Sequence, residues 1–209
     1  MTDARELDNV PWHRLHHAYG PATDVPQLLR DIASRKPKVR EEAWDRLNGN
    51  LWHQGTVYEA AAHAVPFLIE LSQAPNVPER HVVLIYLGVL ASGKSYLDVH
   101  QHMSLFEEER KRPDFTDRLE EELGWVRAAR EAVRAGAPDY ARLFADPAQQ
   151  IRAGAAYLLG HFREDAERNI GWIRAHVDSN EADEVARQCH GCPVGLWPSR
   201  QAVGAAGVS

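Results

Sequence analysis

The sequence predicts an all-α protein, an α-solenoid built from pairs of antiparallel helices. Residues 25–47, VPQLLRDIASRKPKVREEAWDRL, align without a gap on residues 137–159, APDYARLFADPAQQIRAGAAYLL. A shift of 40 residues gives a third copy, in which the Val-Pro pair at 65–66 takes the place of the pair at 25–26. Only one run, HVVLIYL, resembles a buried strand. Recurrence at such a period is typical of stacked helical units.

Each copy is predicted to contain two helices joined by a polar turn. In the first copy, Pro26 stands near the start of the first helix, where its missing N–H costs no hydrogen bond. The second helix carries Val39, Ala43 and Leu47 at spacings of four residues, which places them on one face. Identical residues recur 112 positions later: Pro138, Arg152, Ala155 and Leu159 match Pro26, Arg40, Ala43 and Leu47.

Polar side chains are expected to stabilise three helix starts. Asp24 precedes the first helix of the first copy, and Asp146 precedes a second helix near Pro147. Thr56 followed by Glu59 fits a capping box, in which the two side chains bond backbone N–H groups at a helix start.

The repeats resemble a known helical family. DPAQQIRAGAAYLLG, residues 146–160, resembles the second helix of HEAT repeats, and the spacing of 40 residues agrees with their period. WHRLHHAYGPATDVP and WHQGTVYEAAAHAVPFLIEL resemble segments of uncharacterised bacterial HEAT-like proteins. The resemblance implies a HEAT-like solenoid and brings no known activity.

The chain divides into three predicted parts. Residues 1–23 form a cap on the first repeat, and residues 24–187 form the repeat array. Residues 188–209 form a tail that is truncated or poorly ordered, because they lack helical periodicity. An uncapped last repeat leaves apolar side chains open, which predicts self-association at the C-terminal end. The side chains expected there are Phe162, Ile170, Trp172 and Ile173.

Residues 94–136 interrupt the repeat pattern. A charged loop is expected around Pro113, followed by a long amphipathic helix. Its apolar face is predicted to carry Leu119, Leu123, Val126, Ala129 and Val133. Insertions of this kind lie on one surface of a solenoid and often help to form its binding face.

The composition excludes several function classes. A net charge of −6 argues against a nucleic-acid partner, which would select a basic surface. No apolar run reaches the length of a membrane span and no signal-peptide core begins the chain, so we expect a cytoplasmic protein without a membrane partner. The two cysteines form a lone CHGC motif, and the 11 histidines follow no metal-binding framework. Neither a metal nor a cofactor is predicted.

One motif favours a different function. GVLASGKS, residues 88–95, matches the phosphate-binding loop of P-loop hydrolases, with Gly88, Gly93, Lys94 and Ser95 as its fixed residues. The repeat register instead places Gly88 at the end of a helix core and Gly93 at a C-terminal cap, with Pro78 in the first turn. A P-loop also requires a parallel sheet, which the sequence does not predict. A nucleotide hydrolase therefore remains the alternative function.

A second alternative is a HEAT-like DNA glycosylase. It would need a basic groove and a catalytic carboxylate, and neither can be singled out in the sequence.

Two aromatic and polar segments are candidate protein-binding sites. NGNLWHQGTVYEA contributes Trp52, His53, Gln54, Tyr58 and Glu59, and PWHRLHHAYGP contributes Trp12, His16 and His17. Rigid aromatic rings beside hydrogen-bonding groups are typical of interaction hot spots. The same residues could instead join the first repeat to the second or cap the array. The sequence thus predicts a non-catalytic protein-binding module that acts through a curved helical surface and recognises a protein of unknown identity.

Overall fold

The computed structural model describes residues 4–176, and these are mostly helical, which confirms the all-α prediction. The main helices are α1 (Ala4–Asn9), α2 (Val25–Asp31), α3 (Pro37–Leu51), α4 (Glu59–Gln73), α5 (Arg80–Ala91), α8 (Phe115–Ala135), α9 (Ala137–Arg142), α10 (Gln149–Leu159) and α11 (Ala166–His176). Shorter ones are α6 (Tyr96–His100), η1 (Ser104–Phe106), α7 (Glu107–Arg110), η2 (Leu143–Ala145) and η3 (Arg163–Asp165). Two hairpins pair β1 (His16–His17) with β2 (Gly20–Pro21), and β3 (Trp52–His53) with β4 (Thr56–Val57).

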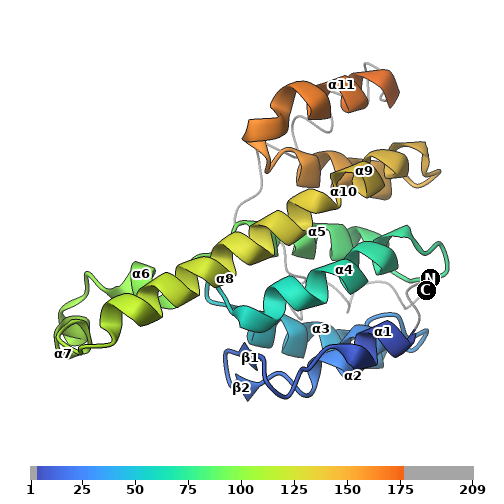
Figure 1. Ribbon diagram of the computed structural model, residues 1–209. Coiled ribbons are helices and arrows are strands. Elements are labelled where there is room, and N and C mark those ends of the chain that lie inside the picture. The colour runs from blue at the N-terminus through green and yellow to red at the C-terminus, as the bar shows by residue number, and fades with distance from the viewer. Residues whose placement is uncertain (1–3, 177–209) are drawn as a thin grey trace, which may run out of the picture.

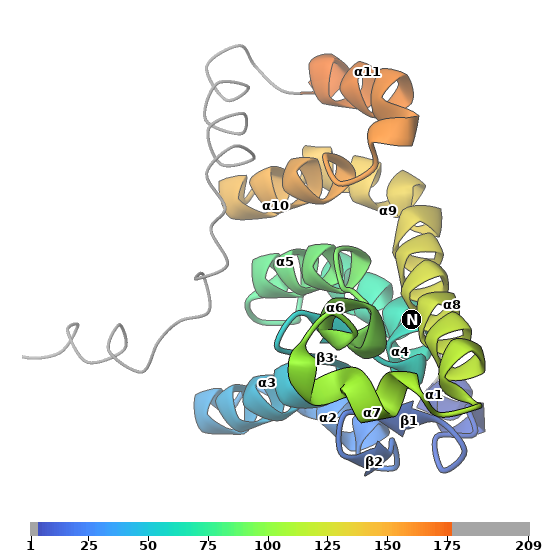
Figure 2. The ribbon, with the colours of Figure 1, turned by 90° about the vertical axis from the view of Figure 1, so that its left-hand side faces the viewer.

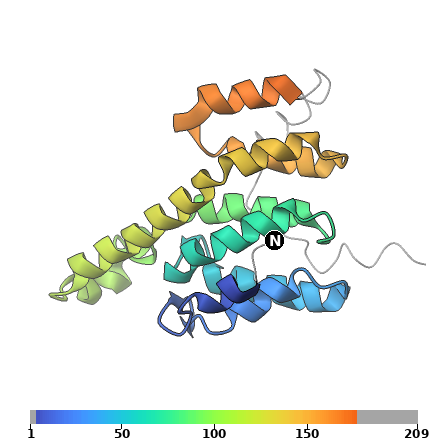
Figure 3. The same ribbon diagram turned by 45° about the vertical axis from the view of Figure 1, so that its right-hand side comes forward.

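The helices lie in successive layers (Figures 1 and 3). Helix α2 packs on α3 and α4, α4 packs on α5, and α5 packs on α10, with α11 against α9. The two aligned segments correspond to α2–α3 and α9–α10. Leu47, Leu87 and Leu159, which match in the alignment, are all at most 1% exposed.

An arginine near the start of each second helix makes comparable contacts. Arg40 donates to the carbonyl of Ser34 at 2.9 Å and, through two nitrogens, to the carboxylate of Glu79. Arg80 donates in the same way to the carbonyl of Ser72 at 3.3 Å and to a carboxylate. Ser34 lies in the turn after α2 and Ser72 in the last turn of α4, so each guanidinium bonds the chain close to the C-terminal end of the preceding helix.

The middle pair departs from the predicted boundaries. Helix α4 begins at Glu59, so Pro66 lies inside the helix, and the prediction that this proline opens the helix was wrong. Pro66 is exposed, so its ring lies on the solvent side of α4, where the lost helix hydrogen bond is tolerated best. Pro78 likewise precedes α5, whose N-cap is Glu79.

The predicted caps are also wrong in detail. Tyr58 is the N-cap of α4, and the Thr56 hydroxyl bonds the carbonyl of His53 at 2.7 Å instead of capping the helix. Asp24 is the N-cap residue of α2, but its side chain makes no cap bond. Asp146 does accept a hydrogen bond from the backbone N–H of Ala148, at 2.9 Å.

The irregular segment contains more helix than the sequence predicted. Helices α6, η1 and α7 lead into α8, whose N-terminal half projects from the layers together with them (Figure 1). The C-terminal half packs on α4 and α5 and buries Ala129 and Val133. Gly136 then joins α8 to α9. The position requires glycine, because a Cβ there would lie 2.6 Å from both Ile69 Cδ1 and Tyr140 Oη.

The C-terminal layer differs from the expected open end. Phe162 is 1% exposed and lies beneath the guanidinium of Arg130, so its predicted exposure was wrong. Trp172 and Ile173 are half-buried against the core, while Ile170 is 44% exposed. Residues 188–209, with the CHGC motif, lie outside the described residues. Within residues 4–176, no helix combines the length and the apolarity that crossing a membrane requires.

Candidate functional site

The two candidate segments of the sequence meet on one side of the protein. The N–H of Ala18, between β1 and β2, donates to the carbonyl of Asn50 at 3.0 Å. The Tyr19 hydroxyl lies 3.2 Å from His53 Nδ1, and the two rings make an edge contact at 5.4 Å. In Figure 2, which views this side, helices α6 and α7 and both hairpins face the viewer. Residues separated by more than thirty positions therefore contribute to one surface.

Positive backbone angles explain why these segments form hairpins. Gln54 and Gly55 have φ values of 51° and 95°, the left-handed conformation that two-residue hairpin loops require. Gly20 has a φ of 126°, which residues with a side chain rarely adopt. These turns aim His53 and Tyr19 toward each other.

Both histidines of β1 have a carboxylate partner. The backbone N–H of His16 donates to Glu59 Oε2 at 3.0 Å, and its ring Nδ1 lies 3.4 Å from the same oxygen. The ring of His17 lies 3.1 Å from Asp24 Oδ1 through Nε2, and Nδ1 accepts from the N–H of Tyr19. These bonds hold the first hairpin against α4 and α2. Among the described residues, no three His, Cys, Asp or Glu side chains gather as a metal site would need.

Trp12 does not belong to the surface. It is 4% exposed, its indole N–H donates to the carbonyl of Leu7 at 2.8 Å, and its ring packs near Phe67. Its predicted binding role was wrong, because a buried side chain cannot meet a partner. Trp52 is half-buried against the core, whereas Gln54 is exposed at the hairpin turn.

Tyr58 connects the hairpins to the irregular segment. Its hydroxyl lies 3.1 Å from the hydroxyl of Thr56, within hydrogen-bond distance. Burial raises the pKa of Tyr58, and the hydrogen bond with Thr56 opposes this rise. The charge of Glu122 raises the pKa further, and Tyr96 and Tyr19 add smaller increases. Groups from α6, α8 and the first hairpin thus act on the pKa of one phenol.

Helices α6 and η1 contribute a part of this surface that the sequence did not predict. Tyr96 lies 4.3 Å from the ring of His100, and Phe106 stacks on His100 at 5.4 Å. The exposed apolar side chains of this segment are Tyr96 (40%), Val99 (40%), Met103 (47%) and Leu105 (77%). A signal was present, since positions 96, 99 and 103 have helical spacing in SYLDVHQHMSLF without a matching partner helix.

We call this surface the hairpin–insert face. It consists of Tyr19, His53, Tyr58, Tyr96, Val99, His100, Met103, Leu105 and Phe106. Of the six large apolar side chains exposed in residues 4–176, five belong to it, counting Tyr19 at 67%. The sixth, Ile170, lies on α11.

The glycines of the GVLASGKS segment serve helix packing. Gly88 lies inside α5, where a Cβ would come within 2.9 Å of His161 Nε2 and of Tyr157 Cε1. Gly93 follows the Ser92 C-cap, and a Cβ on it would lie 2.2 Å from Val57 Cγ1. Gly93 therefore stands at the C-terminal end of the helix as predicted, but close approach to Val57, and not a left-handed turn, requires the glycine.

The polar residues of the same segment are also engaged. The backbone N–H of Lys94 donates to Gly55 at 2.9 Å, and its carbonyl accepts from Val57 at 3.0 Å. Ser95 is 1% exposed, and its hydroxyl donates to Glu122 Oε2 at 2.8 Å. A P-loop needs a free serine hydroxyl and a row of free N–H groups for the nucleotide, and this geometry supplies neither.

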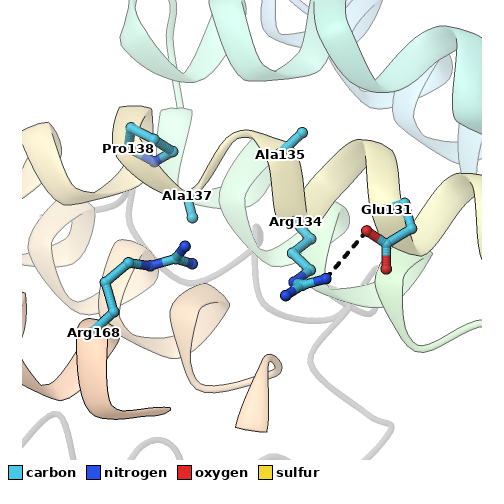
Figure 4. Close-up of a pocket in the computed structure, with 6 residues that line it drawn as sticks. All are labelled: Glu131, Arg134, Ala135, Ala137, Pro138 and Arg168. Carbon is cyan, nitrogen blue, oxygen red and sulfur yellow. Dashed lines mark hydrogen bonds and ion pairs between the residues drawn. The ribbon is translucent and has the colours of Figure 1, made fainter. Parts of the chain in front are cut away.

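An open pocket lies between the end of α8, α9 and α11 (Figure 4). It is lined by Glu131, Arg134, Ala135, Ala137, Pro138 and Arg168. Its two guanidinium groups are already neutralised, because Arg134 bonds both oxygens of Asp165, at 2.6 and 3.1 Å, and Arg168 lies 3.1 Å from the same carboxylate. Arg134 therefore lowers the pKa of Asp165, and the pocket offers no free cation to an anionic ligand.

Comparison with known proteins does not assign this surface. Searches of protein-family models, of curated proteins and of solved structures found no match to the chain.

Proposed function

We propose that this chain is a HEAT-like α-solenoid that binds another protein without catalysing a reaction. The repeated helix pairs support the solenoid, since three sequence copies form stacked pairs with their matching leucines buried. The arginines Arg40 and Arg152 support the same interpretation, because they bond the carbonyls of Ser34 and Asp146, which match in the alignment. The low cysteine content favours a cytoplasmic setting.

The hairpin–insert face is the proposed contact surface. The observation that carries the proposal is the gathering of five of the six exposed large apolar side chains of residues 4–176 on this face. Apolar patches rimmed by polar groups mark interaction sites on soluble proteins, and tyrosine is enriched among hot-spot residues. The contact is thus proposed at the hairpin side of the layers, with α6 and η1, and not along the helices alone.

Affinity capture with matched variants tests this proposal. The full chain is immobilised and exposed to a lysate of its source organism, beside Tyr19→Ser, Leu105→Ser and the control Ile170→Ser. Tyr19 and Leu105 are exposed on the proposed face, whereas Ile170 is exposed on α11. We expect one protein to be captured by the parent and by Ile170→Ser, and to be lost by at least about tenfold with the other two.

Circular dichroism of all four proteins checks that they fold equally. An identical set of captured proteins for every variant would contradict the proposed contact surface.

A further inference from the structure

We propose that the hairpin–insert face binds a basic, amphipathic segment of the partner protein. This inference rests on the proposed function and adds the chemistry of the partner. Apolar side chains of the segment would cover Val99, Met103 and Leu105, and its lysine or arginine side chains would meet exposed carboxylates of residues 94–122.

The insert, by which we mean residues 94–122, carries a negative charge that favours a basic partner. Residues 94–122 hold nine carboxylates and five cations. Most of these cations already have partners within the insert: Lys111 with Glu107 and Glu108, Arg112 with Asp114, Arg118 with Glu109, and Arg110 with the carbonyls of Gln101 and Met103.

Three carboxylates on the outer part of α8 have no such partner. Asp117, Glu120 and Glu121 are exposed, and within residues 4–176 none of them forms an ion pair. The negative potential of the insert is therefore not neutralised from within. A partner with positive charge gains both attraction and faster association at such a surface.

The aromatic residues of the face also favour a basic partner. Tyr19 and Tyr96 present phenol rings that are 67% and 40% exposed, and the charge of the Glu122 carboxylate acts on the phenol of Tyr58. Ring faces attract guanidinium and ammonium groups, and a nearby carboxylate strengthens that attraction. A basic side chain is the one polar group that both features favour.

The same charges disfavour other occupants. A second copy of this chain would bring nine carboxylates against nine, and like charges across an interface cost free energy. Nucleic acids and anionic lipid surfaces meet the same repulsion. A basic protein segment with apolar side chains is the occupant that remains attractive.

A peptide-display selection on the immobilised full chain tests the inference. The library consists of random peptides of about 16 residues, which extend over about 24 Å when helical. We expect the enriched peptides to carry net positive charge and two or more large apolar residues. Their affinities are then measured by fluorescence anisotropy at about 50 mM and about 300 mM salt, because charge-assisted binding weakens as screening increases.

Four variants define the surface in the same assay. Met103→Ser and Leu105→Ser should each lower the affinity for the enriched peptides by at least about tenfold. The double variant Glu120→Gln with Glu121→Gln should lower the affinity for these peptides by about threefold to tenfold, and the affinity should then depend less on salt concentration. Ile170→Ser should leave the affinity unchanged.

The outcomes separate the two proposals. Enrichment of neutral or acidic peptides that lose affinity with Leu105→Ser would overturn the basic partner and leave the proposed contact surface standing. No enrichment, or basic peptides that bind Leu105→Ser as well as the parent, would overturn both. A concentration-dependent dimer in light scattering that disappears with Leu105→Ser would identify a second copy as the occupant and overturn the basic segment.

Discussion

Arg80 Nη2 donates a hydrogen bond to Asp146 Oδ2 at 2.7 Å, across 66 residues of sequence. Both side chains are largely buried, with exposed fractions of 11% and 10%. The bond joins the start of α5 to the loop that precedes α10. In the preceding layer, Arg40 bonds Glu79 in the same manner, directly ahead of α5. One arginine position therefore connects successive helix pairs twice.

Arg80→Ala should lower the free energy of unfolding by about 2 kcal/mol, because it leaves a largely buried carboxylate without its charged donor. Arg142→Ala is the matched control, since Arg142 is 71% exposed and its pair with Asp139 lies along a single helix. We expect a change of less than about 0.5 kcal/mol there. Urea titrations of both variants measure the difference, and equal effects would mean that the Arg80 pair does not connect the layers.

The same pair predicts acid sensitivity. Partial burial opposes ionisation of Asp146, but hydrogen bonds from Ala148 and Arg80 outweigh it and lower the pKa of the carboxyl group. Its stabilising contribution is thus complete above the unfolded-state pKa of 3.8 and is lost as the pH falls through the lower folded-state value. Asp146→Asn should therefore flatten part of the acid limb of a stability–pH curve.

His161 predicts a second loss of stability, nearer neutral pH. The Ser92 hydroxyl donates to the carbonyl of Gly88 at 2.9 Å, so it accepts from His161 Nδ1 at 3.0 Å. His161 Nε2 is buried and has no hydrogen-bond partner among the described residues. Burial, assisted by the charge of Arg130, lowers the pKa of His161 below 6.5.

The unfolded chain therefore binds a proton at His161 before the folded protein does. Stability should fall as the pH decreases through about 6.5 and level off near the lower folded-state pKa. Thermal unfolding between pH 7 and pH 5 measures this slope, which His161→Gln should reduce. His63→Gln, on the exposed side of α4, serves as the control, and an equal reduction in both variants would contradict the assignment to His161.

In the GVLASGKS segment, substitutions at two adjacent residues should differ in their effect on stability. Gly93→Ala should destabilise the protein by about 2 kcal/mol, because the added Cβ would overlap Val57. Lys94→Ala should change stability by less than about 0.5 kcal/mol, since its hydrogen bonds come from the backbone and its side chain is exposed. Calorimetry with Mg-ATP and Mg-GTP should show no binding. A micromolar affinity that Lys94→Ala abolishes would revive the nucleotide hydrolase.

Local periodicity explains what the sequence predicted well. The alignment of residues 25–47 with 137–159 located α2–α3 and α9–α10, because apolar spacing and helix-start prolines are properties of short segments. The same reasoning misplaced the start of α4. Pro66 looked like a first-turn proline, and only its exposure on the finished helix shows why an interior position is tolerated.

The candidate site was only partly predictable. His16, His53 and Glu59 were expected to be functional, but their proximity depends on two hairpins whose turns have no strong sequence signal. Gln54-Gly55 is a weaker hairpin signal than Asn-Gly. Leu105 could not be assigned at all, since exposure of an apolar residue depends on which helices pack nearby.

Helix α8 also acts as a rigid rod between the two ends of the protein. Its 21 residues extend over about 31 Å, so a rotation of about 10° at Gly136 would displace the far end by about 5 Å. The close fit of Gly136 against Ile69 and Tyr140 opposes such a rotation. The packing of Gly136 thus fixes the direction of α8 and the position of residues 94–122 at its far end. A bulkier residue at position 136 would displace that surface without contacting it.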